Sequence, residues 1–228
     1  MPPRNTSSAR HPHQQLPDRV AAHVREQIMS GAMRPGDFLR MEPIAEAVGV
    51  SVTPVREGLL TLSNEGFVTL VPRRGFVVAA FSRQDVRDLF WAQSRLAGEL
   101  AARAAQLATP QHLLRLRTLI AESAAAGEDG DTARIVALGH EFHRTVNLVA
   151  DSDRLARLLA GIVQQLPNSF YASLESDAGT TATEHAELVI ALELRDSPRA
   201  RVLAETHIAD GADFVIDALE QRGVWAKP

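Results

Sequence analysis

Apolar residues in the first third of the chain recur at helical spacing and then at strand spacing. The first helix is expected to start near Leu16 and end at Gly31, because apolar residues repeat every four positions. These residues are Val20, Val24 and Ile28. Two shorter helices follow, and then come two β-like runs, 67–71 and 75–80. Residues 16–81 therefore predict a winged helix-turn-helix of three helices and a two-stranded hairpin.

From residue 82 onward the apolar spacing is helical throughout. Ser82 and Asp85 have the spacing of a capping box that starts the first long helix. The later helix breaks are expected at Gly127–Gly130, Asp151, Pro167 and Ser197-Pro198. Residues 82–228 thus predict an all-α bundle of about six helices. Residues 1–15 are polar and contain prolines, which predicts a disordered tail.

Composition narrows the class of protein. The 228 residues are 45% hydrophobic and include no cysteine, which excludes a disulfide scaffold, a thiolate metal site and a cysteine nucleophile. No apolar run reaches the roughly 18 residues of a membrane helix. The N-terminal segment also lacks the apolar stretch of a secretory signal. We therefore expect a cytoplasmic protein that does not bind membranes.

The net charge of −4 is unevenly distributed along the chain. Residues 1–81 carry nine arginines and seven acidic residues, a net of +2, whereas the remainder has a net of −6. This asymmetry favours a nucleic-acid-facing N-terminal part and an acidic C-terminal part. Lys227 is the only lysine, so genome composition is an equally good explanation of the arginine content.

Several short motifs follow one another between residues 16 and 81. They are Arg34-Pro35-Gly36, Ser51-Val52-Thr53-Pro54-Val55-Arg56-Glu57, Glu65-Gly66-Phe67 and Pro72-Arg73-Arg74-Gly75. In this order they resemble the GntR family of bacterial transcription regulators, and the helical remainder resembles the FCD effector-binding domain of the FadR subfamily. The resemblance implies a ligand-responsive repressor that binds a pseudo-palindromic double-stranded DNA operator as a homodimer, with residues 82–228 binding the effector and forming the dimer.

Such a fold places the start of its recognition helix in the major groove and its wing tip near the minor groove. The residues expected to contact DNA are Arg40, Ser51, Val52, Thr53, Pro54, Arg56, Arg73, Arg74 and Gly75. Ser51 and Thr53 can bond phosphates, and Arg56 can reach a guanine or a phosphate. Val52 stands where the family usually has arginine, and Glu42 stands where it has a basic residue. We therefore expect an unusual operator or weaker binding, with Arg40 as a compensating contact.

Three histidines lie on mainly apolar faces of three predicted helices, namely His143, His185 and His207. A single histidine on such a face is more often a hydrogen-bonded core residue. Three in one small bundle favour a divalent metal site, with zinc or nickel as the expected ion. The resemblance implies the same, because many FCD domains bind a metal through one aspartate and three histidines. Gly139 occupies the aspartate position, so His140, water or the effector is expected to fill it.

Arg95 and Glu99 match an Arg-x-x-x-Glu pattern of the family, whose arginine often points into the effector cavity. An arginine beside a metal suits a small carboxylate effector, whereas the alternative is a surface ion pair between the two residues. A direct metal sensor and a metal-dependent hydrolase are the competing functions. We predict no enzyme, because His140-Glu141-Phe142-His143 has the wrong spacing for a His-Glu-x-x-His helix, and no nucleophile elbow or phosphate loop is present.

Overall fold

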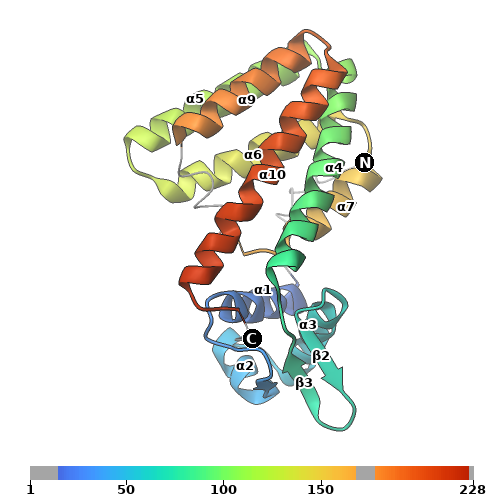
Figure 1. The fold of residues 1–228 in the computed structure, drawn as a ribbon, viewed down its shortest axis with the longest axis vertical. Helices are drawn as coiled ribbons and strands as arrows, with labels where there is room; N and C mark the ends of the chain where they lie inside the picture. Colours follow the sequence, from blue (N-terminus) through green and yellow to red (C-terminus); the bar gives the residue numbers. More distant parts are fainter. Residues whose placement is uncertain (1–14, 168–177, 226–228) are drawn as a thin grey trace, which may run out of the picture. The chain divides into compact units, whose positions relative to one another are not determined.

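The computed structural model describes residues 15–167 and 178–225, which fall into two compact units (Figure 1). The first unit extends to Ile28 and then runs from Ala32 to Ala80. The second unit holds Met29–Gly31 and the chain from Phe81 onward. Apart from Gln15, the tail expected for residues 1–15 lies outside the described residues.

The first unit is a winged helix-turn-helix, as predicted. Its helices are α1 (Leu16–Met29), α2 (Met41–Val48) and α3 (Val52–Asn64), and its strands are β1 (Phe38–Leu39), β2 (Val68–Val71) and β3 (Gly75–Val78). The strands form one antiparallel sheet in the order β1-β3-β2. The sequence predicted only the β2–β3 hairpin, because β1 is two residues long and has no alternating pattern to read.

The turn between α2 and α3 is built by two local features. Gly49 ends α2 with a φ of 74°, a left-handed conformation that glycine adopts without a steric penalty. Ser51 is the N-cap of α3 in an extended conformation, but its hydroxyl makes no capping hydrogen bond. Pro54 lies in the first turn of α3, where no helical partner is needed for its nitrogen. The start of α3 is therefore fixed by its backbone, and the Ser51 hydroxyl is not used to cap it.

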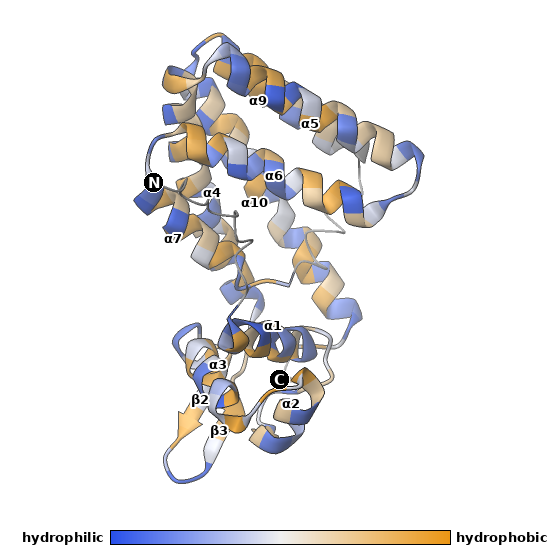
Figure 2. Cartoon of the chain, turned by 180° about the vertical axis from the view of Figure 1, so that it is seen from behind, coloured by the Kyte–Doolittle hydropathy of each residue, from blue (hydrophilic) through white to orange (hydrophobic). Residues whose placement is uncertain are grey.

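The second unit is entirely helical in its described residues. Its helices are α4 (Arg83–Leu107), α5 (Pro110–Glu128), α6 (Thr132–Val149), α7 (Asp153–Val163), α9 (Ala178–Glu193) and α10 (Ser197–Gln221). Helix α10 runs beside α4, and α9 runs beside α5 (Figure 1). Each of these helices carries both hydrophilic and hydrophobic residues along its length (Figure 2), as expected for helices that bury one face.

The core of this helical unit lies between α4, α5, α6, α9 and α10. It contains large, fully buried side chains, among them Leu116, Leu119, Leu138, Phe142 and Leu192. The predicted capping box at the start of α4 is present: the Ser82 N–H donates to Asp85 Oδ2 at 2.7 Å, and the Asp85 N–H donates to Ser82 Oγ at 3.2 Å. No helix in the described part of the chain is both long and apolar enough to cross a membrane.

Candidate metal centre and nucleic-acid interface

Three helices of the second unit bring three histidines together. His143 comes from α6, His185 from α9 and His207 from α10, and one ring nitrogen of each lies within 4.8 Å of the other two. The Nε2 atoms of His143 and His207 lie 3.2 Å apart. The ring centroids are 4.9–5.0 Å apart. The structure therefore assembles the three histidines that the sequence singled out, in an arrangement that could hold a metal ion.

Burial favours the neutral form of His143 and His185. Desolvation, together with the nearby His207, lowers the pKa of His185 to about 3. Desolvation also holds the pKa of His143 well below its ordinary value, and the neighbouring histidines lower it further. His185 is in addition stacked on Phe142, with ring centroids 4.0 Å apart. Because metal ions bind the neutral imidazole, this environment keeps His143 and His185 available as ligands at neutral pH.

The donor set fits a divalent ion such as zinc. Two imidazole nitrogens bound to one tetrahedral zinc at roughly 2.0–2.1 Å are separated by about 3.3–3.4 Å. The 3.2 Å between the Nε2 atoms of His143 and His207 is close to that value. Three neutral histidines and no protein carboxylate would leave one coordination position for a water or a ligand.

The sequence left one ligand position next to these histidines open, at Gly139, with His140, water or the effector expected to fill it. Gly139 is buried one turn before His143 on α6 and has no side chain to offer. His140 is half-buried, and desolvation lowers its pKa. It does not belong to the group whose ligand atoms lie within 4.8 Å of one another, so its role as a substitute ligand stays a prediction.

Glu184 is a residue of this centre that sequence reasoning missed. Its Oε2 lies 2.6 Å from His207 Nδ1, on the opposite side of the imidazole from the nitrogen that faces His143. Glu184 precedes His185 directly on α9. Its link to α10 depends on how the two helices pack, so no local pattern in the sequence marked it.

Arg95 has a different partner from the one considered in the sequence. Its guanidinium pairs with Glu205 Oε2 of α10 at 2.6 Å, and its side chain is 58% exposed. Glu99 instead binds Arg201 at 2.6 Å and Arg103 at 2.7 Å, and the hydrogen bonds from these two arginines lower the pKa of the Glu99 carboxyl. The surface pair between Arg95 and Glu99 is therefore replaced by contacts that join α4 to α10.

The residues expected to contact DNA lie largely on the surface of the first unit. Ser51, Val52, Thr53 and Arg56 are all exposed at the start of α3. Pro54 is buried beneath them, so it shapes the turn and adds no side chain to the exposed face. This surface has the form that a recognition helix presents to a major groove.

The wing between β2 and β3 carries the second exposed basic group. Arg73 and Arg74 are exposed, and Arg73 has a φ of 64° in the tight turn that leads to Gly75. The Arg74 guanidinium lies over the ring of Phe38, 5.4 Å from its centroid. Arg40, just before α2, is exposed as well. Strand β1 thus supports one of the two wing arginines.

The comparisons with known proteins agree with this architecture. Residues 16–78 match the gntR family of bacterial regulatory proteins, and residues 88–210 match the FCD domain. The chain therefore belongs to the GntR family of bacterial transcription regulators, in its FadR-like subfamily with an FCD domain. Members of this family are DNA-binding regulators and not enzymes, which removes the hydrolase from consideration.

Individual relatives support the same family. The chain is 26% identical over 197 residues to the HTH-type transcriptional regulator McbR of Escherichia coli K12, covering 83% of this chain and 87% of McbR. It is 21% identical over 216 residues to the HTH-type transcriptional repressor RspR of the same strain, covering 94% and 95% of the two chains. The solved structure of E. coli McbR superimposes with a TM-score of 0.65 at 23% identity, covering 92% of this chain and 99% of that chain, so the fold is shared.

Proposed function

We propose that this protein is a cytoplasmic repressor that binds a pseudo-palindromic operator through residues 16–81. A small carboxylate effector, bound beside a divalent metal within residues 82–228, controls that binding. The observation that carries the effector half of this proposal is the convergence of three histidines in the helical unit. RspR, a relative along nearly the whole chain, is named a repressor, which supports the direction of regulation.

The DNA-binding half is supported by the exposed start of α3 and the exposed wing arginines. We assign Arg56 a contact with a base edge or phosphate, and such a contact is worth about 1–3 kcal/mol, or roughly 5- to 150-fold in affinity. Arg56→Ala is therefore expected to weaken operator binding by that factor in a gel-shift titration. Arg154→Ala, which removes an exposed arginine from α7, is the matched control. Unchanged affinity for Arg56→Ala would remove this residue from the interface.

The metal half is supported by the spacing of His143, His185 and His207 and by the lowered pKa values of His143 and His185. Zinc or nickel is the expected ion, because imidazole suits both. Metal analysis should find about one divalent ion per chain in protein purified without a nickel column, and much less in His185→Ala. Near-zero metal in both proteins, even after incubation with zinc, would end the proposal of a metal site.

A carboxylate effector fits the charge of such a centre. Three histidine ligands contribute no negative charge of their own to a divalent ion and leave one coordination position open, which favours an anionic oxygen ligand. Arg95 is the second proposed anchor, and it would have to exchange its bond with Glu205 for one with the effector. A thermal-shift screen of small carboxylic acids, with and without zinc, is the direct test. Stabilisation that needs zinc and falls in Arg95→Ala supports this arrangement.

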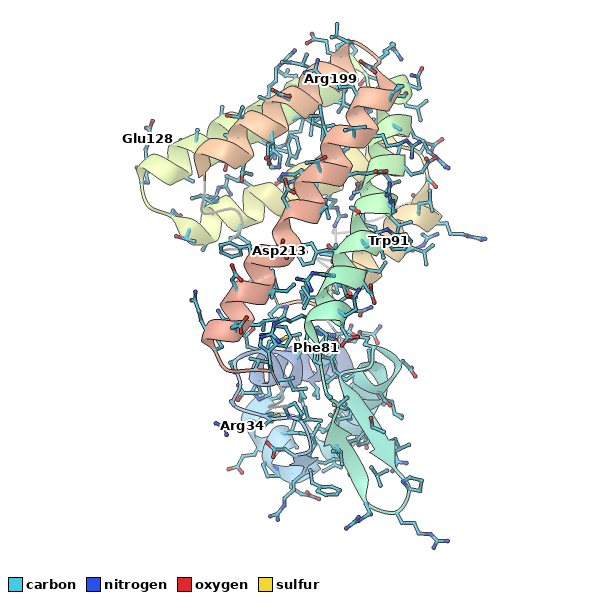
Figure 3. The ribbon with its side chains drawn as sticks, in the orientation of Figure 1. Arg34, Phe81, Trp91, Glu128, Arg199 and Asp213 are labelled. Atoms are coloured by element: carbon cyan, nitrogen blue, oxygen red, sulfur yellow. The ribbon has the colours of Figure 1, made fainter. Side chains whose placement is uncertain are left out.

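Homodimerisation through the helical unit is the remaining part of the proposal. Large apolar side chains stay exposed on this unit: Trp91 on α4 (Figure 3), Leu114 on α5, Leu194 directly after α9 and Val202 on α10, all at least 60% exposed. Such surface is usual where a second copy binds. Sedimentation equilibrium at micromolar concentration should return twice the 24.8 kDa chain mass. A monomer at that concentration would contradict it.

A direct metal sensor is the second candidate, since the histidine cluster itself needs no organic ligand to hold an ion. The two functions differ in one titration. If zinc alone alters operator affinity, the ion is the signal. If zinc has no effect until a carboxylate is added, the metal serves as an anchor for the effector.

A further inference from the structure

We propose that Glu184 is a positioning residue of the metal centre, whose carboxylate fixes the ring of His207 so that Nε2 faces His143 and His185. This inference rests on the metal site proposed above and extends it beyond the three ligands. Its structural basis is the 2.6 Å contact between Glu184 Oε2 and His207 Nδ1.

The contact determines which nitrogen of His207 carries the proton. An ionised carboxylate only accepts hydrogen bonds, so Nδ1 must be the donor. In a neutral imidazole the other nitrogen, Nε2, then holds the lone pair. That nitrogen is the one lying 3.2 Å from His143 Nε2. Glu184 therefore selects the tautomer in which His207 can act as a ligand.

The same contact also holds the imidazole in place. His207 is mostly buried and Glu184 is partly exposed, with 17% and 38% of their side-chain surfaces accessible. A charge-assisted hydrogen bond in this setting is stronger than a neutral one, and it restricts rotation of the ring. It also places one negative charge next to a centre whose three ligands are neutral, which compensates part of the charge of a bound cation.

Helix α9 therefore has two roles in this centre through adjacent residues. His185 supplies a ligand, and Glu184 supports the ligand that comes from α10. Successive residues on a helix point about 100° apart, so one turn of α9 can reach both the centre and the neighbouring helix. A carboxylate of this kind raises the basicity of the histidine it holds, and its removal typically lowers metal affinity by about 10- to 100-fold.

Zinc affinity, measured by competition with a chromophoric chelator, tests this role in the full-length protein. Glu184→Ala is expected to bind zinc about 10- to 100-fold more weakly than the wild type. Glu184→Gln should lose less, because its amide oxygen still accepts from Nδ1 although the charge is gone. Glu187→Gln, one turn further along α9 and 3.6 Å from Arg199, is the control and should bind as the wild type does. Thermal unfolding of the metal-free variants shows whether each one is folded.

Nitrogen-15 NMR of the histidine rings gives a second readout that needs no metal. In the metal-free wild type, His207 should be the Nδ1-protonated tautomer, and in Glu184→Ala this preference should be lost. Nε2-protonated His207 in the wild type would overturn the proposal even if the variants were unstable.

The two levels of proposal fail in different ways. Wild-type zinc affinity in both Glu184 variants, with weakened binding in His207→Ala, would overturn the role of Glu184 alone. Absence of zinc binding in the wild type would overturn the metal site itself, and the role of Glu184 with it.

Discussion

A buried ion pair ties α1 to the end of α3, and its removal is expected to destabilise the first unit selectively. Arg25 of α1 meets Glu65, the C-cap of α3, at 2.5 Å, with only 8% and 18% of their side-chain surfaces exposed. The Arg25 guanidinium also lies 5.6 Å from the centroid of the Phe67 ring. Glu65→Ala would leave this guanidinium buried without its carboxylate.

The magnitude follows from that burial. Removing one partner of a buried pair costs about 3–5 kcal/mol, and the partial exposure of Glu65 places this pair at the lower end, about 3 kcal/mol. Glu65→Gln keeps an acceptor for the arginine and should cost about 1–2 kcal/mol. The double variant Arg25→Met with Glu65→Leu removes both charges and should recover most of the loss, because neither group is then buried alone.

Hydrogen exchange of the amides in α1 and α3 is the appropriate assay. Both tryptophans, Trp91 and Trp225, belong to the second unit, so their fluorescence serves as an internal control. We expect the free energy of opening to fall in the first unit while the fluorescence transition in urea is unchanged. A loss below about 0.5 kcal/mol in Glu65→Ala, the usual range for exposed surface positions, would refute the reasoning.

Three further predictions concern other parts of the chain. Gly98→Ala should destabilise the helical unit by about 1–2 kcal/mol, although alanine has a better helix propensity than glycine. The reason is that the new Cβ would lie 2.4 Å from Glu205 Cγ. An unchanged melting temperature in thermal unfolding would contradict this. Phe38→Ala should weaken operator binding about two- to five-fold by releasing Arg74, since a cation–π contact is worth about 0.5–1 kcal/mol, and equal affinity in a gel shift would exclude this support. In the metal-free protein, His185 has a pKa of about 3 when folded and about 6.5 when unfolded. Between these pH values the unfolded chain binds a proton at His185 and the native state does not. The free energy of unfolding should therefore fall by up to about 1.4 kcal/mol per pH unit as the pH drops from 6.5 toward 3. Urea titrations at a series of pH values should show a weaker dependence of this free energy on pH in His185→Gln than in the wild type.

Local signals in the sequence predicted most of the fold. The α4 capping box and the break between α5 and α6 at Gly127–Gly130 are set by residues within a few positions of one another, so their patterns can be read directly. Strand β1 could not be predicted, because its two residues gain their strand conformation only by pairing with β3.

The candidate site was predictable to a smaller degree. The three histidines were predicted from their positions on apolar helix faces and from the resemblance to FCD domains. The partner of Arg95 lies 110 positions away on α10, and the contact of Glu184 joins two helices, so both depend on helix packing. His140 is three residues from His143, which leaves it about 60° away around the axis of α6 and outside the cluster.

Gly139 has a consequence for how this regulator can evolve. Glycine and aspartate codons can differ by a single nucleotide, so one mutation at this position could restore a carboxylate one turn before His143. In the metal site proposed above, the aspartate would complete the set of one aspartate and three histidines that many FCD domains use, and it would add a negative charge to three neutral ligands. A descendant with Gly139→Asp would therefore be expected to hold the proposed metal ion more tightly, so metal retention could change through a single codon.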